Sequence, residues 1–363
     1  MNARQFFTYR IYFVKGVSIL AVICAHISSV LYFTGNSENP VDILNVYLFA
    51  ISRFAVPVFF TLSAFYLALN PKCYHSPSWL YRRRLPHLVI PYFLYTTIYA
   101  FPDIIKSTDP AAILLCYLTG NGEYHLWFVF VVIQLYLLHP ILYRCFLYFR
   151  KRLPFFFTLA IVIQIIWNIA VSISFHYCTN TTGAAYHILS FLNRSVFGSL
   201  GYFMAGYELN ENADSILNLL RRNRTTILSI GVMVVGAGIT VLMWSMGIRP
   251  EGSIQPIPFN NVILSLLDPL LGAASFLLLF RLSDWIPLHA LPGRIIHTAG
   301  LYSYGIYLLH PLFLTKIEIV LNRFLQIEMS NISLYFLTFF FTTILSLLVA
   351  KLIVKLPHSR YFA

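Results

Sequence analysis

Charged residues are scarce in this chain. They make up 10% of its 363 residues, whereas 58% of the residues are hydrophobic and the mean hydropathy is +0.73. So apolar a composition excludes a water-soluble globular protein. The segments between the apolar runs are too short to form folded domains, and the first run is too long for a cleavable signal peptide. We therefore expect a single membrane domain over residues 1–363.

The cysteine patterns that indicate a metal site or a disulfide framework are also absent. The five cysteines are odd in number and are scattered without a Cys-x-x-Cys spacing. We therefore expect no metal site, and the chemistry has to come from polar side chains of other kinds.

What the chain does have is long apolar runs. Ten of them have the length of about twenty residues that is needed to cross a hydrocarbon core. A further apolar stretch, 110–119, is too short to cross, so we expect it to be interfacial or re-entrant. The sequence thus predicts an all-α integral membrane protein with about ten transmembrane helices. The predicted spans are 11–33, 44–69, 86–105, 125–147, 154–176, 186–207, 226–246, 260–281, 300–321 and 332–354.

The net charge of +12 reflects membrane topology rather than affinity for nucleic acid. If the N-terminus is cytoplasmic, most of the 25 Lys and Arg residues fall at the inner ends of the spans or in the inner loops. Positive charge is retained on the cytoplasmic side of membrane proteins. The pattern predicts that both termini are cytoplasmic, and it supports the number of ten spans.

His26 lies inside the first span, eleven positions after Lys15. At 3.6 residues and 5.4 Å per turn, the two side chains share one helix face about 16 Å apart. A polar side chain at this depth is costly unless it faces a cavity, a partner or a pathway. Such positions predict a central polar cavity with His26 as a site candidate. The alternative is that His26 is a hydrogen-bonded packing residue.

Arg53 lies in the middle of the second span, where an arginine costs on the order of 3 kcal/mol to insert. One interpretation is a structural ion pair, with Asp268 of the eighth span as the candidate partner. The other is a cation that lines the cavity and binds a carbonyl or phosphate group.

Three consecutive arginines, Arg82, Arg83 and Arg84, lie at the predicted inner surface of the membrane. They are either topology anchors that contact lipid headgroups or a clamp for a phosphate group of a cytoplasmic cosubstrate.

Two further polar pairs are candidates, one of them on the outer side and one inside a span. Glu123 and His125 lie at the start of the fourth span, where a carboxylate beside an imidazole can orient a hydroxylic acceptor or tune a base. Their neighbour Tyr124 fits an aromatic belt. In the ninth span, Tyr307 and His310 lie on one helix face. They either form hydrogen bonds between helices or line the cavity.

In their order along the chain, these motifs resemble the membrane acyltransferase-3 family. The resemblance covers most of the chain, and the order of the motifs makes coincidence improbable. Its marks are Lys15 and His26 with ten residues between them, the run from Arg53 to Ser63, Arg82 to Arg84 ahead of Pro91-Tyr92, His125-Leu-Trp127-Phe, the run from Gly201 to Gly206, and the run from Ser303 to Pro311.

The resemblance implies a membrane O-acyltransferase that moves acetyl from cytoplasmic acetyl-CoA to a hydroxyl of an envelope glycan or lipid-linked saccharide. His26 would be the general base or an acyl relay, and Arg53 or a tyrosine hydroxyl would stabilise the oxyanion. The other residues expected at the catalytic site are Glu123, Tyr307 and His310. The residues expected to bind the phosphates of acetyl-CoA are Lys15, Arg82, Arg83 and Arg84.

Four positions depart from the family pattern. The histidine among them stands where a second arginine is expected, so we expect the phosphate contact there either to be weaker or to be made by Arg82 or Arg83 instead. We expect no attached hydrolase-like domain that passes the acetyl group onward, and we therefore expect transfer to finish in the membrane part. The departing residues are Tyr12, Lys15, Ala64 and His87.

Two other functions stay open. The same polar residues would suit a transporter or flippase for a lipid-linked sugar, although no convincing repeat relates the two halves of the chain. The chain could also be a noncatalytic partner of a polysaccharide synthase. In each case we expect a multi-pass protein of the cytoplasmic membrane of a bacterium.

Overall fold

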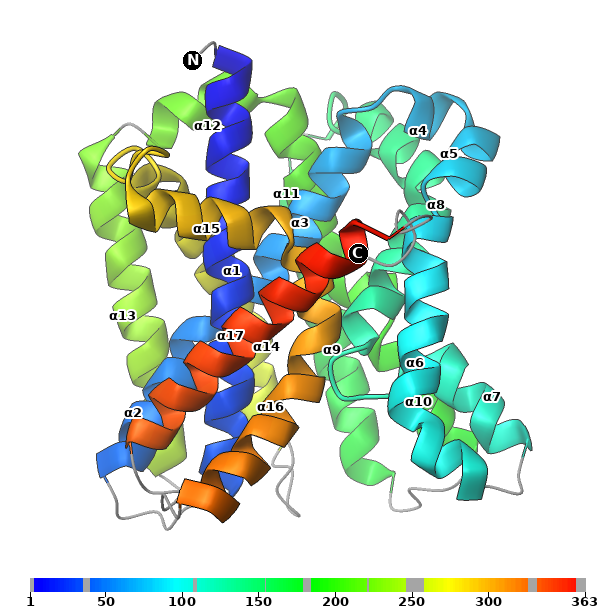
Figure 1. Ribbon diagram of the computed structural model, residues 1–363. Helices are drawn as coiled ribbons and strands as arrows, with labels where there is room; N and C mark the ends of the chain where they lie inside the picture. Colours follow the sequence, from blue (N-terminus) through cyan, green and yellow to red (C-terminus); the bar gives the residue numbers. More distant parts are fainter. Residues whose placement is uncertain are drawn as a thin grey trace.

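The structure is a computed structural model in which every regular element is a helix. It describes residues 3–34, 40–106, 110–153, 155–178, 184–220, 222–245, 258–325 and 332–356, and these contain no strand. The predicted all-α class is therefore confirmed (Figure 1). In chain order the helices are α1 (Ala3–Thr34), α2 (Pro40–Ser52), α3 (Ala55–Ala68), α4 (Lys72–His75), α5 (Pro77–Arg83), α6 (Pro86–Lys106), α7 (Pro110–Thr119), α8 (Trp127–Phe149), α9 (Phe156–Tyr177), α10 (Ala184–Asn193), the 3-10 helix η1 (Val196–Ser199), α11 (Leu200–Glu211), α12 (Ala213–Leu220), α13 (Asn223–Ser245), α14 (Pro258–Leu282), α15 (Leu291–Leu301), α16 (Ser303–Leu325) and α17 (Ile332–Val354).

Seven helical segments among the described residues are long and apolar enough to cross a membrane. Two other predicted spans are occupied by the continuous helices α6 and α13, and the stretch 110–119 forms the short helix α7. The predicted span 186–207 is divided between α10, η1 and α11. The number of ten spans and the location of the termini stay predictions. The seven segments are Tyr9–Ser29, Leu44–Ala68, Trp127–Phe149, Phe156–Tyr177, Ile263–Leu282, Ser303–Leu321 and Ile332–Val354.

Two glutamines compensate the break between α10 and α11. Gln134 of α8 donates to the carbonyl of Arg194 at 2.7 Å and accepts from the backbone N–H of Val196 at 3.1 Å. Gln164 of α9 accepts from the backbone N–H of Gly201 at 2.8 Å. Backbone groups that leave a helix inside a membrane need partners, because lipid offers none. These side chains therefore stabilise an irregular segment within an apolar stretch.

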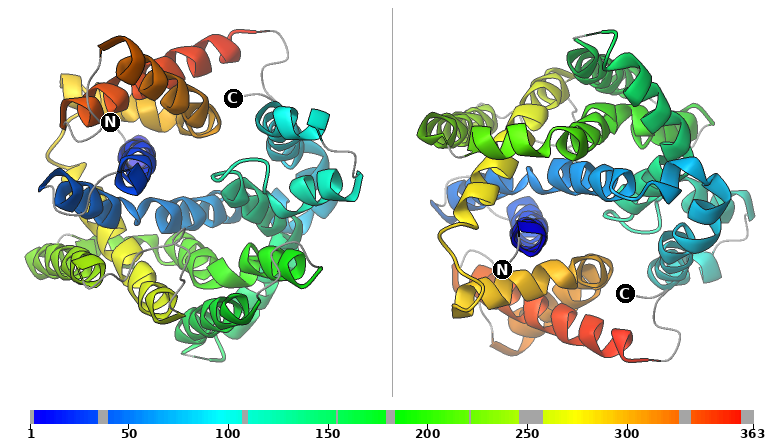
Figure 2. Two further views of the ribbon diagram at one scale, coloured as in Figure 1. Left: turned by 90° about the horizontal axis from the view of Figure 1, so that it is seen from below. Right: turned by 90° about the horizontal axis from the view of Figure 1, so that it is seen from above.

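Helix α1 passes between α2 and α3 on one side and α15, α16 and α17 on the other (Figure 2). Its backbone touches that of α15. A Cβ atom on Gly16 would lie 1.9 Å from the carbonyl oxygen of Ile296, and one on Gly300 would lie 1.9 Å from that of Tyr12. Glycine is required at both positions, because any side chain would overlap the neighbouring helix. This close contact fixes the position of α1 next to Lys15.

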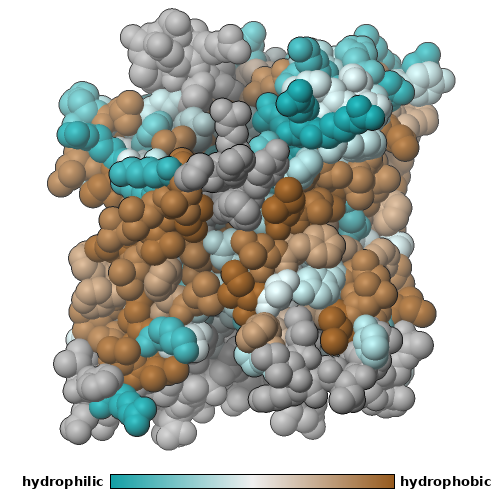
Figure 3. Space-filling model, turned by 45° about the vertical axis from the view of Figure 1, so that its right-hand side comes forward, coloured by the Kyte–Doolittle hydropathy of each residue, from teal (hydrophilic) through white to brown (hydrophobic). Residues whose placement is uncertain are grey.

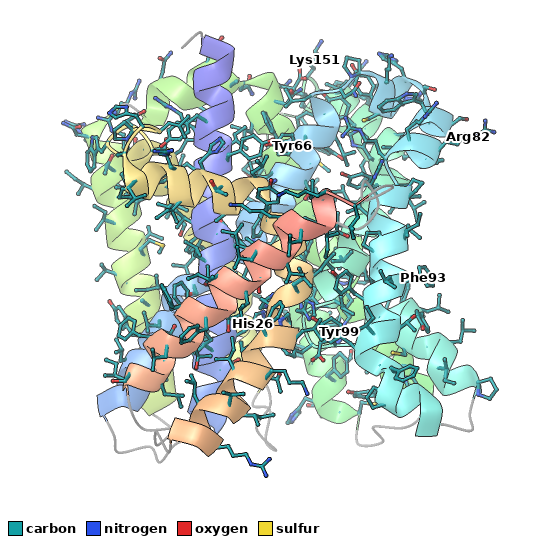
Figure 4. All side chains as sticks on the ribbon, in the orientation of Figure 1. His26, Tyr66, Arg82, Phe93, Tyr99 and Lys151 are labelled. Carbon is teal, nitrogen blue, oxygen red and sulfur yellow. The ribbon has the colours of Figure 1, made fainter. Side chains whose placement is uncertain are left out.

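One face of the molecule carries an apolar belt (Figure 3). Figure 3 shows hydrophobic residues across the middle of one face and hydrophilic residues toward its upper end. The N-terminus marked in Figure 1, together with Arg82 and Lys151 labelled in Figure 4, lies at that same end. His26 and Tyr99 lie toward the opposite half (Figure 4). Arg82 and Lys151 therefore lie toward the end of the molecule that is opposite to the half with His26 (Figure 4).

Candidate active site

Histidine and tyrosine rings from distant parts of the chain meet around His26. The ring of His26 on α1 stacks on that of His310 on α16, with the centroids 5.2 Å apart. The ring of Tyr124 lies 4.7 Å from His26, and the ring of His125 lies 5.4 Å from His310. His125 and His310 are 1% and 0% exposed. Two of the predicted site residues, His26 and His310, are therefore brought together in the interior.

A proline determines how the imidazole of His310 is held. Pro311 has no N–H, so the carbonyl of Tyr307, four residues earlier, lacks its helical partner. Nδ1 of His310 lies 2.8 Å from that oxygen. Because a carbonyl can only accept, Nδ1 carries the proton and Nε2 carries the lone pair. Nε2 is buried and has no hydrogen-bond partner among the described residues, so it can accept a proton or a hydrogen bond.

Tyr307 and Tyr99 fix the position of His125. The hydroxyl of Tyr307 donates to the backbone carbonyl of His125. The ring of Tyr99 meets the imidazole edge-on at 5.2 Å, and its hydroxyl donates to the carbonyl of Leu308 at 2.7 Å. Both ring nitrogens of His125 are buried without a hydrogen-bond partner in the described part of the chain. Such groups are costly unless a polar ligand satisfies them.

The turn from Gly120 to His125, which leads into α8, is held by residues from other parts of the chain. Gly120 adopts φ +69°, a conformation that other residues rarely adopt. The guanidinium of Arg194 donates to the carbonyl of Thr119 at 2.6 Å and to the side chain of Asn121. Because Gln134 fixes the backbone of Arg194, the turn is tied to the break between α10 and α11.

Glu123 lies beside the ring cluster and is partly buried. Its Oε1 accepts from the backbone N–H of Tyr124 at 3.1 Å. Burial raises the pKa of its carboxyl above the ordinary value, and the hydrogen bond opposes that shift. Packing against the histidine rings partly buries Tyr124, and this partial burial and then the nearby charge of Glu123 raise the pKa of its phenol, which is protonated at neutral pH. The cluster thus has a carboxylate and a hydroxyl donor at its edge.

Arg53 forms an ion pair with Asp268, the partner named by the first of its two interpretations. Its Nε and Nη2 donate to the two carboxylate oxygens at 3.1 and 2.8 Å. This bidentate geometry compensates the charge and joins the junction of α2 and α3 to α14. Whether Arg53 also acts in catalysis stays a prediction.

Lys15 is enclosed by tyrosines rather than by carboxylates. Its ammonium lies 5.4 Å from the ring of Tyr12 and 5.7 Å from that of Tyr66, and no ion pair of Lys15 occurs within the described residues. An unpaired cation in a mostly apolar setting is suited to binding an anion.

The three consecutive arginines lie elsewhere. They end α5 or follow it, and their side chains are exposed, with Arg84 lying 5.8 Å from the ring of Trp79. Arg82 lies well apart from Tyr66, which contacts Lys15 (Figure 4). The structure thus separates Lys15 from Arg82, two of the residues predicted to bind one cosubstrate.

Comparison with known proteins identifies the family of the chain. A family model described as an acyltransferase domain matches residues 8–351. Relatives in Staphylococcus aureus strains MSSA476, MRSA252 and MW2 are 22% identical over 318 residues, which cover 85% of this chain and 84% of each relative. Each is named a probable poly-beta-1,6-N-acetyl-D-glucosamine export protein. No solved structure matches the chain. Since the family model covers nearly the whole chain, this protein belongs to the membrane acyltransferase-3 family.

Proposed function

We propose that the protein transfers an acetyl group from acetyl-CoA to a hydroxyl of a cell-envelope saccharide. The observation that carries the proposal is the stack of His26 on His310 in the interior of an acyltransferase-family chain. The name of the S. aureus relatives supports an N-acetylglucosamine polymer, or its lipid-linked precursor, as the class of acceptor. The bacterial inner membrane is the proposed location, because acetyl-CoA is cytoplasmic.

In this mechanism His26 is the general base. Its neutral imidazole takes the proton from the acceptor hydroxyl while that oxygen attacks the thioester carbonyl. The carbon–sulfur bond then breaks, and the thiolate of CoA leaves with the proton that His26 held. His310, through its free Nε2, accepts a hydrogen bond from a second hydroxyl of the acceptor and so keeps the acceptor oriented. A transient acetyl group on His26 is the alternative route, with the same residues in place.

The negative charge on the carbonyl oxygen needs a donor in the transition state. The phenol of Tyr124 lies beside His26 and stays protonated, so it can supply this hydrogen bond. Arg53 was the other candidate. Its bidentate pair with Asp268 favours a supporting role for Arg53, because the guanidinium already compensates a carboxylate.

The donor would enter from the end of the molecule that carries the N-terminus. Lys15 would bind a phosphate of acetyl-CoA, since the described residues provide no carboxylate for it. The separation of about 16 Å between Lys15 and His26 suits the long arm between the phosphates and the thioester. Arg82, Arg83 and Arg84 are exposed and would attract the anionic donor to this end.

Mass spectrometry of envelope glycans tests this function. Cells carrying the wild-type protein should show an acetyl increment on a glycan, and His26→Ala should lower it about a hundredfold or more at equal protein level. His289→Ala is the matched control, because His289 is exposed and distant in sequence from the cluster. Equal acetylation by wild type and His26→Ala would overturn the proposal.

Export of a saccharide is the second candidate function, and the name of the relatives favours it. The two functions differ in whether acetylation of the glycan depends on the protein. If glycan reaches the surface only when the protein is present, but its acetylation is the same with and without the protein, export replaces acyl transfer.

A further inference from the structure

Tyr124 differs from the other rings of the cluster in its exposure. It is 44% exposed, whereas His125 and Tyr307 are 1% and 6% exposed. Its ring nevertheless lies 4.7 Å from that of His26 and 5.6 Å from that of His125. Tyr124 therefore connects the buried imidazoles to the surface of the molecule.

Glu123 adds a polar group at the same place. One carboxylate oxygen accepts from the backbone N–H of Tyr124, while the other has no described hydrogen bond. An aromatic face beside a carboxylate suits the ring of a sugar. The C–H bonds of a pyranose carry partial positive charge and pack on the negative face of an aromatic ring, while its hydroxyls donate to a carboxylate.

The turn is rigid enough to present these groups. Arg194 holds its beginning through Thr119 and Asn121, and Tyr307 holds its end through the carbonyl of His125. In between, Gly122 packs so closely on Thr96 of α6 that an added Cβ would lie 2.6 Å from the Cγ2 of that threonine. Three separate helical regions therefore fix the turn, and little ordering is needed when a ligand binds.

We propose that the turn from Gly120 to His125 is the acceptor subsite, in which a pyranose ring stacks on Tyr124 and donates a hydroxyl hydrogen bond to Glu123. The inference rests on the proposed function and specifies where its acceptor binds. In this position a second hydroxyl of the same ring reaches His26, because the Tyr124 and His26 rings are in contact. Arg194 is a positioning residue, because it acts on the sugar only through the turn.

The test measures binding of a soluble N-acetylglucosamine oligosaccharide to the purified full-length protein by isothermal titration calorimetry. Tyr124→Ala should weaken binding about tenfold, because the stacking surface is lost. Tyr124→Phe should bind within about twofold of the wild type, because it keeps the ring. Equal binding by Tyr124→Ala and the wild type overturns the subsite. An equal loss of binding in Tyr124→Ala and Tyr124→Phe also overturns the subsite, because binding would then depend on the hydroxyl rather than on the ring.

Steady-state kinetics separates this proposal from the proposed function. With acetyl-CoA as donor, Tyr124→Ala should raise KM for the oligosaccharide about tenfold and leave KM for the donor unchanged. If the wild type binds the sugar but transfers no acetyl group, the proposed function fails while the binding result still decides the subsite. A rise in the KM of the donor alone would overturn the subsite.

The KM of the oligosaccharide distinguishes a positioning role of Arg194 from a purely structural one. Arg194→Ala should raise KM for the oligosaccharide, and added guanidinium ion should partly restore it by occupying the space beside Thr119 and Asn121. Arg323→Ala is the matched control, because Arg323 is an exposed arginine on another helix. Loss of activity in Arg194→Ala with no change in the KM of the oligosaccharide would overturn the positioning role.

Discussion

The bond between His310 and the carbonyl of Tyr307 exists because the next residue is proline. Replacing Pro311 with alanine supplies a backbone N–H that competes for this carbonyl. We expect Pro311→Ala to lower kcat about tenfold or more, because Nδ1 of His310 loses its partner and the tautomer is no longer fixed. The thermal midpoint in detergent should stay the same or rise, because the helix gains a hydrogen bond.

Pro102→Ala in α6 is the control for this variant. Pro102 is also a proline inside a helix, but it is exposed and the residue before it is not a histidine. Both variants would be compared by initial rates at saturating substrate. Full activity in Pro311→Ala together with a higher thermal midpoint would show that the tautomer of His310 is not important.

Glu123 should set part of the pH dependence. Burial raises the pKa of its carboxyl, so the group becomes protonated at a higher pH than an exposed glutamate does. If the carboxylate binds the acceptor, kcat/KM for the acceptor falls as the pH is lowered through this raised pKa. Glu123→Gln should have a lower plateau without that limb, and Asp214→Asn, a change at an exposed carboxylate, should keep it. An identical acid limb in Glu123→Gln and the wild type would contradict this assignment.

Part of the site could be predicted from sequence and part could not. His26, Tyr307 and His310 stand out because polar side chains are rare in apolar spans. The structure places Tyr307 and His310 beside His125, and His26 beside His310. Tyr99 gives no such signal, because tyrosine is common at membrane surfaces and its partner Leu308 lies 209 positions away. Contacts over such distances depend on how the helices pack, which periodicity does not reveal.

At the scale of elements, close contact between helices rests on single glycines. A Cβ on Gly206 of α11 would lie 2.2 Å from the carbonyl oxygen of Thr61 on α3. We expect Gly206→Ala to destabilise the protein by about 1–3 kcal/mol, because the helices must separate. Thermal unfolding in detergent measures the effect.

Gly231 provides a matched comparison, because a Cβ there meets nothing within 4 Å. Gly231→Ala should leave the thermal midpoint unchanged or raise it slightly, since alanine favours a helix more than glycine does. If both variants unfold at the same temperature as the wild type, the contact between α3 and α11 is looser than described.

The long helices were predictable because each needs only a run of apolar residues. The break in 186–207 was not predicted, since hydropathy averages over Arg194, although Gly198 and Gly201 in the same stretch are a signal of irregular backbone. Helix α15 was also missed. It is too short to be recognised as a span, and its close contact with α1 depends on Gly16 and Gly300 rather than on its hydropathy.

At the scale of the whole molecule, the distribution of charge predicts the orientation in the membrane. Ser78 lies in α5 beside the arginines, whereas Tyr177, which is 77% exposed, ends α9 after the chain has run back from Lys151. In a background without the five native cysteines, a membrane-impermeant maleimide added outside spheroplasts should label Tyr177→Cys and not Ser78→Cys. The reverse labelling would invert the topology.

The position of Lys15 and His26 on one continuous helix has a consequence for what crosses the bilayer. Helix α1 is held against α15 at Gly16, so its two polar ends keep a constant spacing. If the donor binds at Lys15 and the saccharide at Tyr124, an acetyl group moves toward the saccharide and the proton of the acceptor hydroxyl moves toward the thiolate of CoA, so no net charge passes between the two compartments. Acetylation of the outer glycan would then consume cytoplasmic acetyl-CoA without moving nucleotide or sugar, and its rate would be insensitive to the membrane potential.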